Sequence, residues 1–272
     1  MSTAATPTPS GTSGGRAAGD VTQIRTFNRY ELKYLADPAL VTAIRAAVTP
    51  RLDIDAHSGG AAYPLWSLYY DTADLRCYWE KIDGLKFRRK LRVRCYGEAG
   101  AVAPDTPVWV EIKQRLNRVT QKRRALLRYD DARAVCAGEV ADGGAPEDAA
   151  VMDEVRRFVT ELSLVPSSVV GYQREAFVGR DEDAGLRLTI DHRVRGRITD
   201  LDLAVAGANH NIVRPDLAVV EIKVNERVPY WLTETVARLG LQIVRISKYC
   251  QSIDTCRVAR DVPIHSLTKG SH

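Results

Sequence analysis

The sequence predicts an α+β protein in which a closed antiparallel β-barrel forms a tunnel with a basic lumen, flanked by α-helices. One observation is that several strand-like segments alternate charged with apolar residues; the other is that four further segments have helical features. Successive side chains on a strand point to opposite faces, so each such strand has one charged and one apolar face. A barrel with a polar lumen and helices outside keeps those charges out of a dry core.

The strand with the clearest alternation spans residues 86–94, Lys-Phe-Arg-Arg-Lys-Leu-Arg-Val-Arg. Five cations share one face: Lys86, Arg88, Lys90, Arg92 and Arg94. The opposite face carries Phe87, Leu91 and Val93, which indicates that the strand packs on a core. Two like charges about 4 Å apart repel by about 4 kcal/mol at an effective dielectric constant of about 20. The row of cations therefore requires solvent or a bound anion.

Five further segments repeat this alternation and add carboxylates to the charged face. They span residues 29–33, 108–115, 172–174, 186–191 and 217–223. Their charged residues are Arg29, Glu31, Lys33, Glu111, Lys113, Arg115, Arg174, Arg187, Asp191, Glu221 and Lys223. Cations select phosphate, and a few carboxylates among them can hold a divalent metal that bridges phosphate oxygens. The recurrence on six strands favours a phosphate-binding lumen over a set of merely solvated faces.

Four segments are expected to form helices. The first follows Asp37, an N-cap residue, with Pro38 in the first turn. The second runs from about residue 148 to 162 and has one apolar stripe, and the others span about 230–239 and 247–257. Residues 181–185 are expected to form a hairpin turn.

Length and composition predict one folded domain over residues 21–262 of the 272-residue chain. Residues 1–20, rich in Ser, Thr, Ala, Gly and Pro, are expected to be a disordered tail, and residues 263–272 a C-terminal tail. The five cysteines have no metal-binding spacing and fit a reducing cytoplasm. The net charge of +5 is modest for a nucleic-acid binder, and no apolar run approaches a membrane span of about 18 residues. We therefore expect a soluble, cytoplasmic protein that does not bind nucleic acid.

Several motifs occur in one order along the chain. They are Glu31 and Lys33, then Tyr69-Tyr70-Asp71-Thr72, Arg92 and Arg94, Glu111 and Lys113, Lys122 and Arg124, Tyr172 and Arg174, Arg187, Glu221 and Lys223, and Ser247-Lys248. In this order the chain resembles the triphosphate tunnel metalloenzymes from about residue 27 to 253. Within that superfamily it is most similar to the polyphosphate polymerase domain of the vacuolar transporter chaperone (VTC) family.

Three positions depart from the family pattern. Arg29 stands where the hydrolases of the superfamily carry the first acid of Glu-x-Glu-x-Lys, so one metal carboxylate is missing, which favours the polymerase branch. Arg115 replaces a histidine of the polymerase pattern, which puts any role of that histidine in doubt. Arg245 replaces a lysine, which keeps the charge but changes its geometry.

The resemblance implies a metal-dependent phosphotransferase that moves the terminal phosphate of ATP, or of another nucleoside triphosphate, to a growing polyphosphate chain. Its metal, Mn²⁺ or Mg²⁺, would be held by Glu221, Glu111 and Glu31. The implied catalytic residues are Lys33, Arg92, Arg94, Lys113, Arg174, Arg187 and Lys248. The implied phosphate-binding residues are Lys90, Arg115, Lys122, Arg124, Tyr172, Lys223, Arg245 and Ser247. Inorganic polyphosphate or pyrophosphate would be a further ligand, and a membrane-protein partner is compatible with this assignment.

Two alternatives stay open on the sequence. A tunnel triphosphatase would use water as the phosphoryl acceptor. A module that binds polyphosphate or nucleic acid without chemistry would need only the cations. Single-strand binders usually place exposed aromatic residues between their cations, whereas the charged faces here are nearly free of them.

Overall fold

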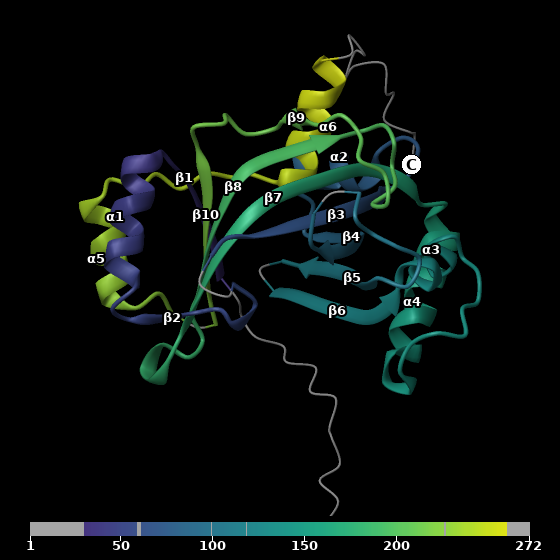
Figure 1. Ribbon diagram of the computed structural model, residues 1–272, viewed down its shortest axis with the longest axis horizontal. Helices are drawn as coiled ribbons and strands as arrows, with labels where there is room; N and C mark the ends of the chain where they lie inside the picture. The colour runs from purple at the N-terminus through teal and green to yellow at the C-terminus, as the bar shows by residue number, and fades with distance from the viewer. Residues whose placement is uncertain (1–29, 59–60, 99, 118, 226, 260–272) are drawn as a thin grey trace, which may run out of the picture.

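The computed structural model describes residues 30–58, 61–98, 100–117, 119–225 and 227–259 (Figure 1). Its strands are β1 (Tyr30–Ala36), β2 (Leu52–Ile54), β3 (Tyr63–Asp71), β4 (Phe87–Tyr96), β5 (Pro107–Leu116), β6 (Val119–Arg128), β7 (Val165–Gly179), β8 (Arg187–Arg197), β9 (His210–Asn211) and β10 (Ala218–Val224). Its α-helices are α1 (Pro38–Val48), α2 (Arg76–Ile82), α3 (Tyr129–Cys136), α4 (Ala149–Leu162), α5 (Tyr230–Arg238) and α6 (Lys248–Val258). The tails expected at residues 1–20 and 263–272 lie outside the described residues, as does Arg29.

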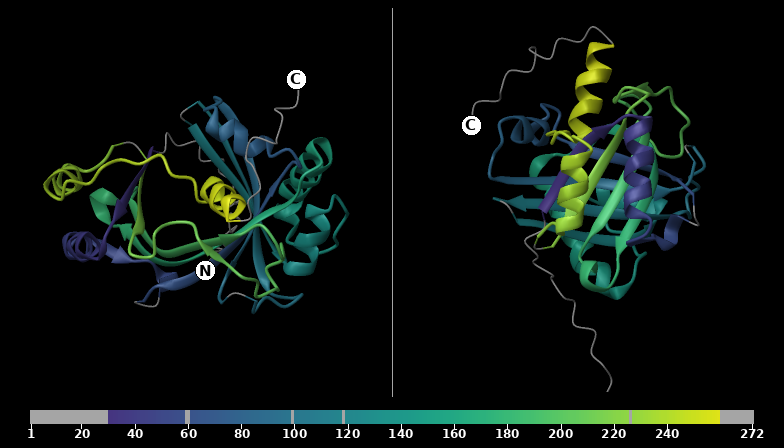
Figure 2. Two further views of the ribbon diagram at one scale, coloured as in Figure 1. Left: turned by 90° about the horizontal axis from the view of Figure 1, so that it is seen from above. Right: turned by 90° about the vertical axis from the view of Figure 1, so that its left-hand side faces the viewer.

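One large antiparallel sheet organises the molecule. Its strands follow the order β1-β10-β8-β7-β3-β4-β5-β6, with β2 paired to β7 and β9 to β8. The sheet curls around α6, which contacts β7 and β8 on its concave side (Figure 2). Within the described residues, no backbone pairing joins β6 to β1, so hydrogen bonds do not close the sheet. The α+β class and the antiparallel sheet are thus confirmed, while the closed barrel stays a prediction.

The connection between α5 and α6 lies along the free edge of β1. Ile243 forms an isolated bridge with Tyr34, and the amide of Val244 donates to the carbonyl of Lys33 over 2.8 Å. A side-chain contact also crosses from β1 to β5, where Lys113 Nζ lies 3.0 Å from Glu31 Oε2. The connection therefore flanks the edge of β1, and a side-chain contact links β1 to β5 near the other end of the sheet.

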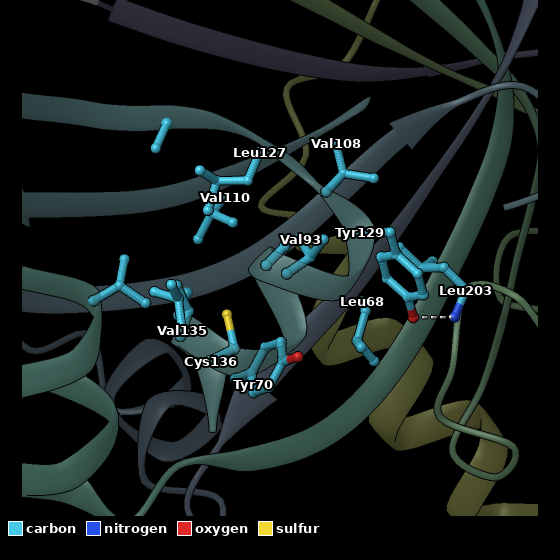
Figure 3. Packing of buried hydrophobic residues seen from close by; sticks show 14 of the residues in the cluster. Leu68, Tyr70, Val93, Val108, Val110, Leu127, Tyr129, Val135, Cys136 and Leu203 are labelled. Atoms are coloured by element: carbon cyan, nitrogen blue, oxygen red, sulfur yellow. Dashed lines mark hydrogen bonds between the residues drawn. The ribbon is translucent and has the colours of Figure 1, made fainter. Parts of the chain in front are cut away.

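Apolar cores cover the convex face on both sides of the molecule. Helices α3 and α4 pack on the side that includes β4, β5 and β6, where Val93, Val110 and Val135 are buried (Figure 3). Phe158 of α4 is buried in the same core. Helices α1 and α5 pack on β1, β8 and β10. A third cluster lies between α2, α6 and the concave face. This arrangement leaves the charged sides of the strands on the concave face.

All four expected helices and all six expected charged strands are present, most with ends displaced by a few residues. Strand β7 extends well beyond the expected residues 172–174 at both ends, and β8 continues past residue 191 to Arg197. The expected hairpin turn is a single turn of 3₁₀ helix at Asp181–Asp183 that joins β7 to β8. The sequence interpretation assigned no strand to β3 or β6 and no helix to α2 or α3. None of the described helices has the length and apolar character needed to cross a bilayer. The five cysteines, all within the described residues, are buried thiols.

Candidate functional site

A first cluster of charges on the concave face is centred on Glu111 of β5. Strand pairing places Glu111 between Arg92 of β4 and Arg124 of β6. Its carboxylate lies 2.7 Å from Arg92, 2.8 Å from Lys122 and 3.9 Å from Arg94. Burial opposes ionisation of this carboxyl, but Arg92, Arg94 and Lys122 outweigh it and hold its pKa far below the ordinary value. Glu111 is therefore a buried counter-ion for three cations.

A second cluster is centred on Glu221 of β10. Its Oε2 lies 2.7 Å from Lys223 Nζ, and its Oε1 lies 2.7 Å from Lys248 Nζ and 3.5 Å from Lys33 Nζ. Burial again opposes ionisation, but Lys223, Lys248 and Lys33 hold the pKa of Glu221 well below its usual range. Burial lowers the pKa of Lys223 and Glu221 raises it, but burial has the larger effect, so the pKa falls to about 8. Lysines on three different elements thus share one carboxylate.

Asp191 of β8 extends this second cluster. Arg174 of β7 donates to both oxygens of Asp191, over 2.6 and 2.8 Å, and Lys248 Nζ lies 2.6 Å from the same carboxylate. Lys248 is buried at the start of α6, where the hydroxyl of Ser247 caps the helix by accepting from the amide of Cys250. Burial lowers the pKa of Lys248, but Asp191 and Glu221 overcome it and raise the pKa above its ordinary value. This lysine is therefore cationic between two buried carboxylates.

Tyr172 of β7 connects the two clusters. Its hydroxyl accepts from Arg94 over 3.2 Å. Its ring lies 5.0 Å from the Arg174 guanidinium carbon and 4.9 Å from Lys248 Nζ. The charged residues consequently form one continuous face, in which the hydroxyl faces one cluster and the ring faces cations of the other.

Tyr69 of β3 belongs to the first cluster, although its motif alone did not indicate this. Its hydroxyl accepts from Arg92 Nη1 over 3.1 Å, and its ring lies 5.2 Å from that of Tyr249. Burial raises the pKa of Tyr69, but Arg92 and Arg94 outweigh it and lower the pKa to about 8. Lys90 lies beside this group, 3.4 Å from Ser247 Oγ and 4.8 Å from the centre of the Tyr249 ring.

Three predicted residues lie away from these two carboxylate-centred clusters, and a fourth borders the first of them. Arg187 pairs with Asp55 over 2.6 Å. Arg124, which lies opposite Glu111 in the strand pairing, stacks 3.9 Å above the ring of Trp109. Arg115 donates to the carbonyl of Asn117 in the turn after β5. Arg245 is exposed on the connection between α5 and α6.

The three predicted metal carboxylates divide into two groups. Glu31 and Glu221 both contact Lys33 Nζ, at 3.1 and 3.5 Å, whereas Glu111 lies in the other cluster. Across the described residues, no three His, Cys, Asp or Glu side chains are grouped closely enough to hold a metal by themselves. Magnesium and manganese sites on phosphate substrates commonly use one or two carboxylates and complete the shell with phosphate oxygens and water. Glu31 and Glu221, on either side of one ammonium group, fit that kind of site.

The Tyr-Tyr-Asp-Thr motif at residues 69–72 contributes a structural carboxylate that the sequence did not reveal. Asp71 is fully buried and accepts hydrogen bonds from the amides of Cys77 and Tyr78, over 2.7 and 3.0 Å, and from the hydroxyl of Tyr249. It therefore joins α2 to α6 and fixes the position of α6 under the concave face. Asp191 was predicted to belong to a charged strand but was not predicted as a site residue. The available signal was that it shares one face of β8 with Arg187.

Comparison with solved structures identifies distant likenesses. A Hippeastrum protein studied as an adenylyl cyclase, with a dominant triphosphatase activity, is 16% identical, with a TM-score of 0.45 over 83% of this chain and 95% of its own. A protein from Pyrococcus horikoshii is 13% identical, with a TM-score of 0.43 over 84% of this chain and 99% of its own.

Sequence comparison is more informative. Subunit 4 of the vacuolar transporter chaperone complex from Trypanosoma cruzi is 25% identical over 70% of this chain and 28% of its own length. The corresponding subunit from Trypanosoma brucei brucei is 24% identical over 85% of this chain and 35% of its own. The chain thus spans about a third of the length of these relatives. The VTC domain profile matches residues 28–257, which include every strand and helix described above except the last residue of α6. The chain therefore belongs to the VTC domain family.

Proposed function

We propose that this chain is a tunnel-type phosphotransferase that moves the terminal phosphoryl group of ATP to a growing polyphosphate chain. The observation that carries the proposal is the continuous concave face on which buried carboxylates are each shared by several cations. Such a face holds more positive than negative groups and can take up a polyanion. Membership of the VTC domain family supports the same substrate class.

Phosphate oxygens would replace the carboxylates as partners of the cations. Arg92 and Arg94 lie on the same face of β4, where Arg92 contacts Glu111 and Arg94 donates to the Tyr172 hydroxyl. Arginine can bind phosphate through two parallel hydrogen bonds. Lys113, Arg174 and Arg187 would bind further oxygens along the same face. Because phosphoryl transfer depends mainly on positioning and charge stabilisation, the chain needs no protein nucleophile.

A divalent cation, Mn²⁺ or Mg²⁺, would be held by Glu221 and Glu31 together with phosphate oxygens, and would neutralise charge on the transferring group. Lys33, which contacts both carboxylates in the structure, would then be released to bind phosphate. Glu111 is the third carboxylate proposed as a ligand, in the neighbouring cluster.

In the proposed reaction, a terminal oxygen of the polyphosphate chain forms a bond to the γ-phosphorus of ATP. The bond from that phosphorus to the β,γ-bridging oxygen breaks, and ADP leaves with the electron pair. The lengthened chain would leave through a closed tunnel past Lys122, Arg124, Lys223 and Lys248. For the tunnel to be closed, the Lys113–Glu31 contact and the α5–α6 connection along β1 would have to remain in place during turnover. A membrane-protein partner, by analogy with the chaperone-complex subunits, is part of the same proposal.

Incubation of the pure protein with γ-labelled ATP and Mn²⁺ tests this proposal. Labelled polymer on a gel supports the polymerase, and free labelled phosphate supports a triphosphatase. Binding of polyphosphate without either product supports a non-catalytic module. Arg94→Ala should abolish turnover, whereas Arg214→Ala, which removes an exposed partner of Asp216, should not. Equal activity in these two variants would contradict the assignment of the concave face.

A further inference from the structure

Four large apolar side chains are exposed where β4 begins and β5 ends. Ile82, Leu85, Phe87 and Leu116 expose 50%, 50%, 47% and 52% of their surfaces. Phe87 and Leu116 lie opposite each other in the pairing of β4 with β5. Leu85 precedes Phe87 by two residues, in the short connection from the end of α2, where Ile82 is the last helical residue. We call these four residues the apolar tip.

The apolar tip continues a buried face beyond the helix that covers it. Phe87 and Leu91 share one face of β4, and Leu91 is fully buried in the core that contains Phe158 of α4. The guanidinium of Arg89 lies over the rings of both Phe158 and Phe87, at 4.2 and 5.7 Å, and so marks the edge of that cover. Single exposed apolar residues are ordinary, but several together usually mark an interaction surface.

Cations lie next to the apolar tip in the chain and in the strand pairing. On the concave side of the same strand ends, Arg88 lies opposite Arg115. Burial and then the charge of Arg115 lower the pKa of Arg88, and burial and then Arg88 lower the pKa of Lys81 at the end of α2. Lys86 lies between Leu85 and Phe87 and accepts the amide of Asn117 at its carbonyl. Like charges are therefore gathered beside an apolar centre, where an anionic partner would relieve their repulsion.

We propose that the apolar tip and its neighbouring cations dock on an anionic lipid bilayer. Apolar side chains of this size enter the boundary between headgroups and acyl chains, while Lys and Arg extend to the lipid phosphates. A soluble polyphosphate would match the cations but would leave the apolar side chains in water. A second copy of the chain would match the apolar side chains but would bring two sets of like charges together. Of these three occupants, the anionic bilayer is the one that satisfies both components.

Vesicle co-sedimentation tests the proposal with the full chain. The protein should bind vesicles that contain phosphatidylglycerol and should not bind vesicles of phosphatidylcholine alone. The triple variant Leu85→Ser, Phe87→Ser, Leu116→Ser should bind the anionic vesicles at least about tenfold more weakly, because it loses apolar area but no charge. The matched control is Val140→Ser with Tyr230→Ser, which removes side chains that are 74% and 83% exposed elsewhere. Equal vesicle binding by the triple variant and the control would overturn the proposal.

Fluorescence gives a second measurement that leaves the fold undisturbed. In a Phe87→Trp variant, the added emission should be quenched by anionic vesicles with brominated acyl chains, whereas that of a Tyr230→Trp variant should not. Absence of quenching in the Phe87→Trp variant would also overturn the proposal. So would self-association of the wild type, measured by sedimentation velocity, that the triple variant loses, because the surface would then bind a second copy of the chain. The affinity for tripolyphosphate should be unchanged in the triple variant. Hence loss of vesicle binding with intact polyphosphate synthesis separates this proposal from the proposed catalytic function.

Discussion

Replacing Glu111 by Gln removes the charge at the centre of the first cluster while nearly preserving its shape. The side chain is 3% exposed and contacts Arg92, Lys122 and Arg94, so the variant leaves three cations without their counter-ion. Removing one partner of a buried ion pair costs about 3–5 kcal/mol. The side chains of Lys122 and Arg92 are 43% and 20% exposed. Water therefore screens part of the repulsion, and we expect a loss of about 2–3 kcal/mol.

For a domain of this size, that loss corresponds to a decrease in Tm of about 4–12 °C. The pKa of Glu111 lies below its value in the unfolded chain, so its contribution is complete above the unfolded pKa of about 4.3 and disappears as the pH falls towards the native pKa. The difference between wild type and variant should therefore be full at pH 7 and should shrink below about pH 4. Differential scanning calorimetry over this pH range measures both quantities.

Tripolyphosphate should stabilise the Glu111→Gln variant more than the wild type, because phosphate supplies the missing counter-charge without displacing a carboxylate. The matched control is Glu154→Gln, which removes the partner of Arg123 on the convex face, where side chains are 26–30% exposed. It should cost less than about 1 kcal/mol and should not alter the response to tripolyphosphate. An unchanged Tm in Glu111→Gln, or an equal ligand shift in both variants, would refute the role of Glu111 as a counter-ion that phosphate replaces.

Three further changes probe the second cluster and the ionisation of the lumen. Glu221→Gln should abolish metal-dependent turnover because it removes the central carboxylate; full activity across a Mn²⁺ titration would exclude Glu221 as a ligand. Lys248→Met should destabilise the fold by about 3–5 kcal/mol at pH 7, since Asp191 and Glu221 lose a shared cation. Urea unfolding should show that part of this loss is recovered at pH 5, because one of the two carboxyl groups gains a proton there. Binding of tripolyphosphate, measured by calorimetry, should weaken between pH 7 and 9, because the pKa values of Lys122 and Lys223 are lowered to about 8 and both ammonium groups lose protons in that range. A constant affinity over this interval would contradict a role for these two lysines in binding.

The helix boundaries illustrate how much local sequence decides. Asp37 and Pro38 define the start of α1, and Ser247 caps α6, because capping depends on the residues within one turn. Strands with one charged face were equally readable, since alternation follows from backbone geometry alone. Strand β3 escaped prediction because Leu65–Asp71 are buried on both faces, which removes the alternation.

Local sequence patterns determined only part of the candidate site. Sequence alone assigned Glu111 and Glu221 to charged strand faces, because a side chain's face depends on its own strand. Which cations each carboxylate contacts depends on the pairing of strands distant in sequence and on the docking of α6, which brings Lys248 to Asp191 and Glu221. The same holds for the ends of the sheet. The alternation predicted a closed barrel with a charged lumen, but whether β6 pairs with β1 depends on tertiary packing, and no such pairing is present within the described residues. Long-range contacts of this kind are set by the whole chain, and no local pattern encodes them.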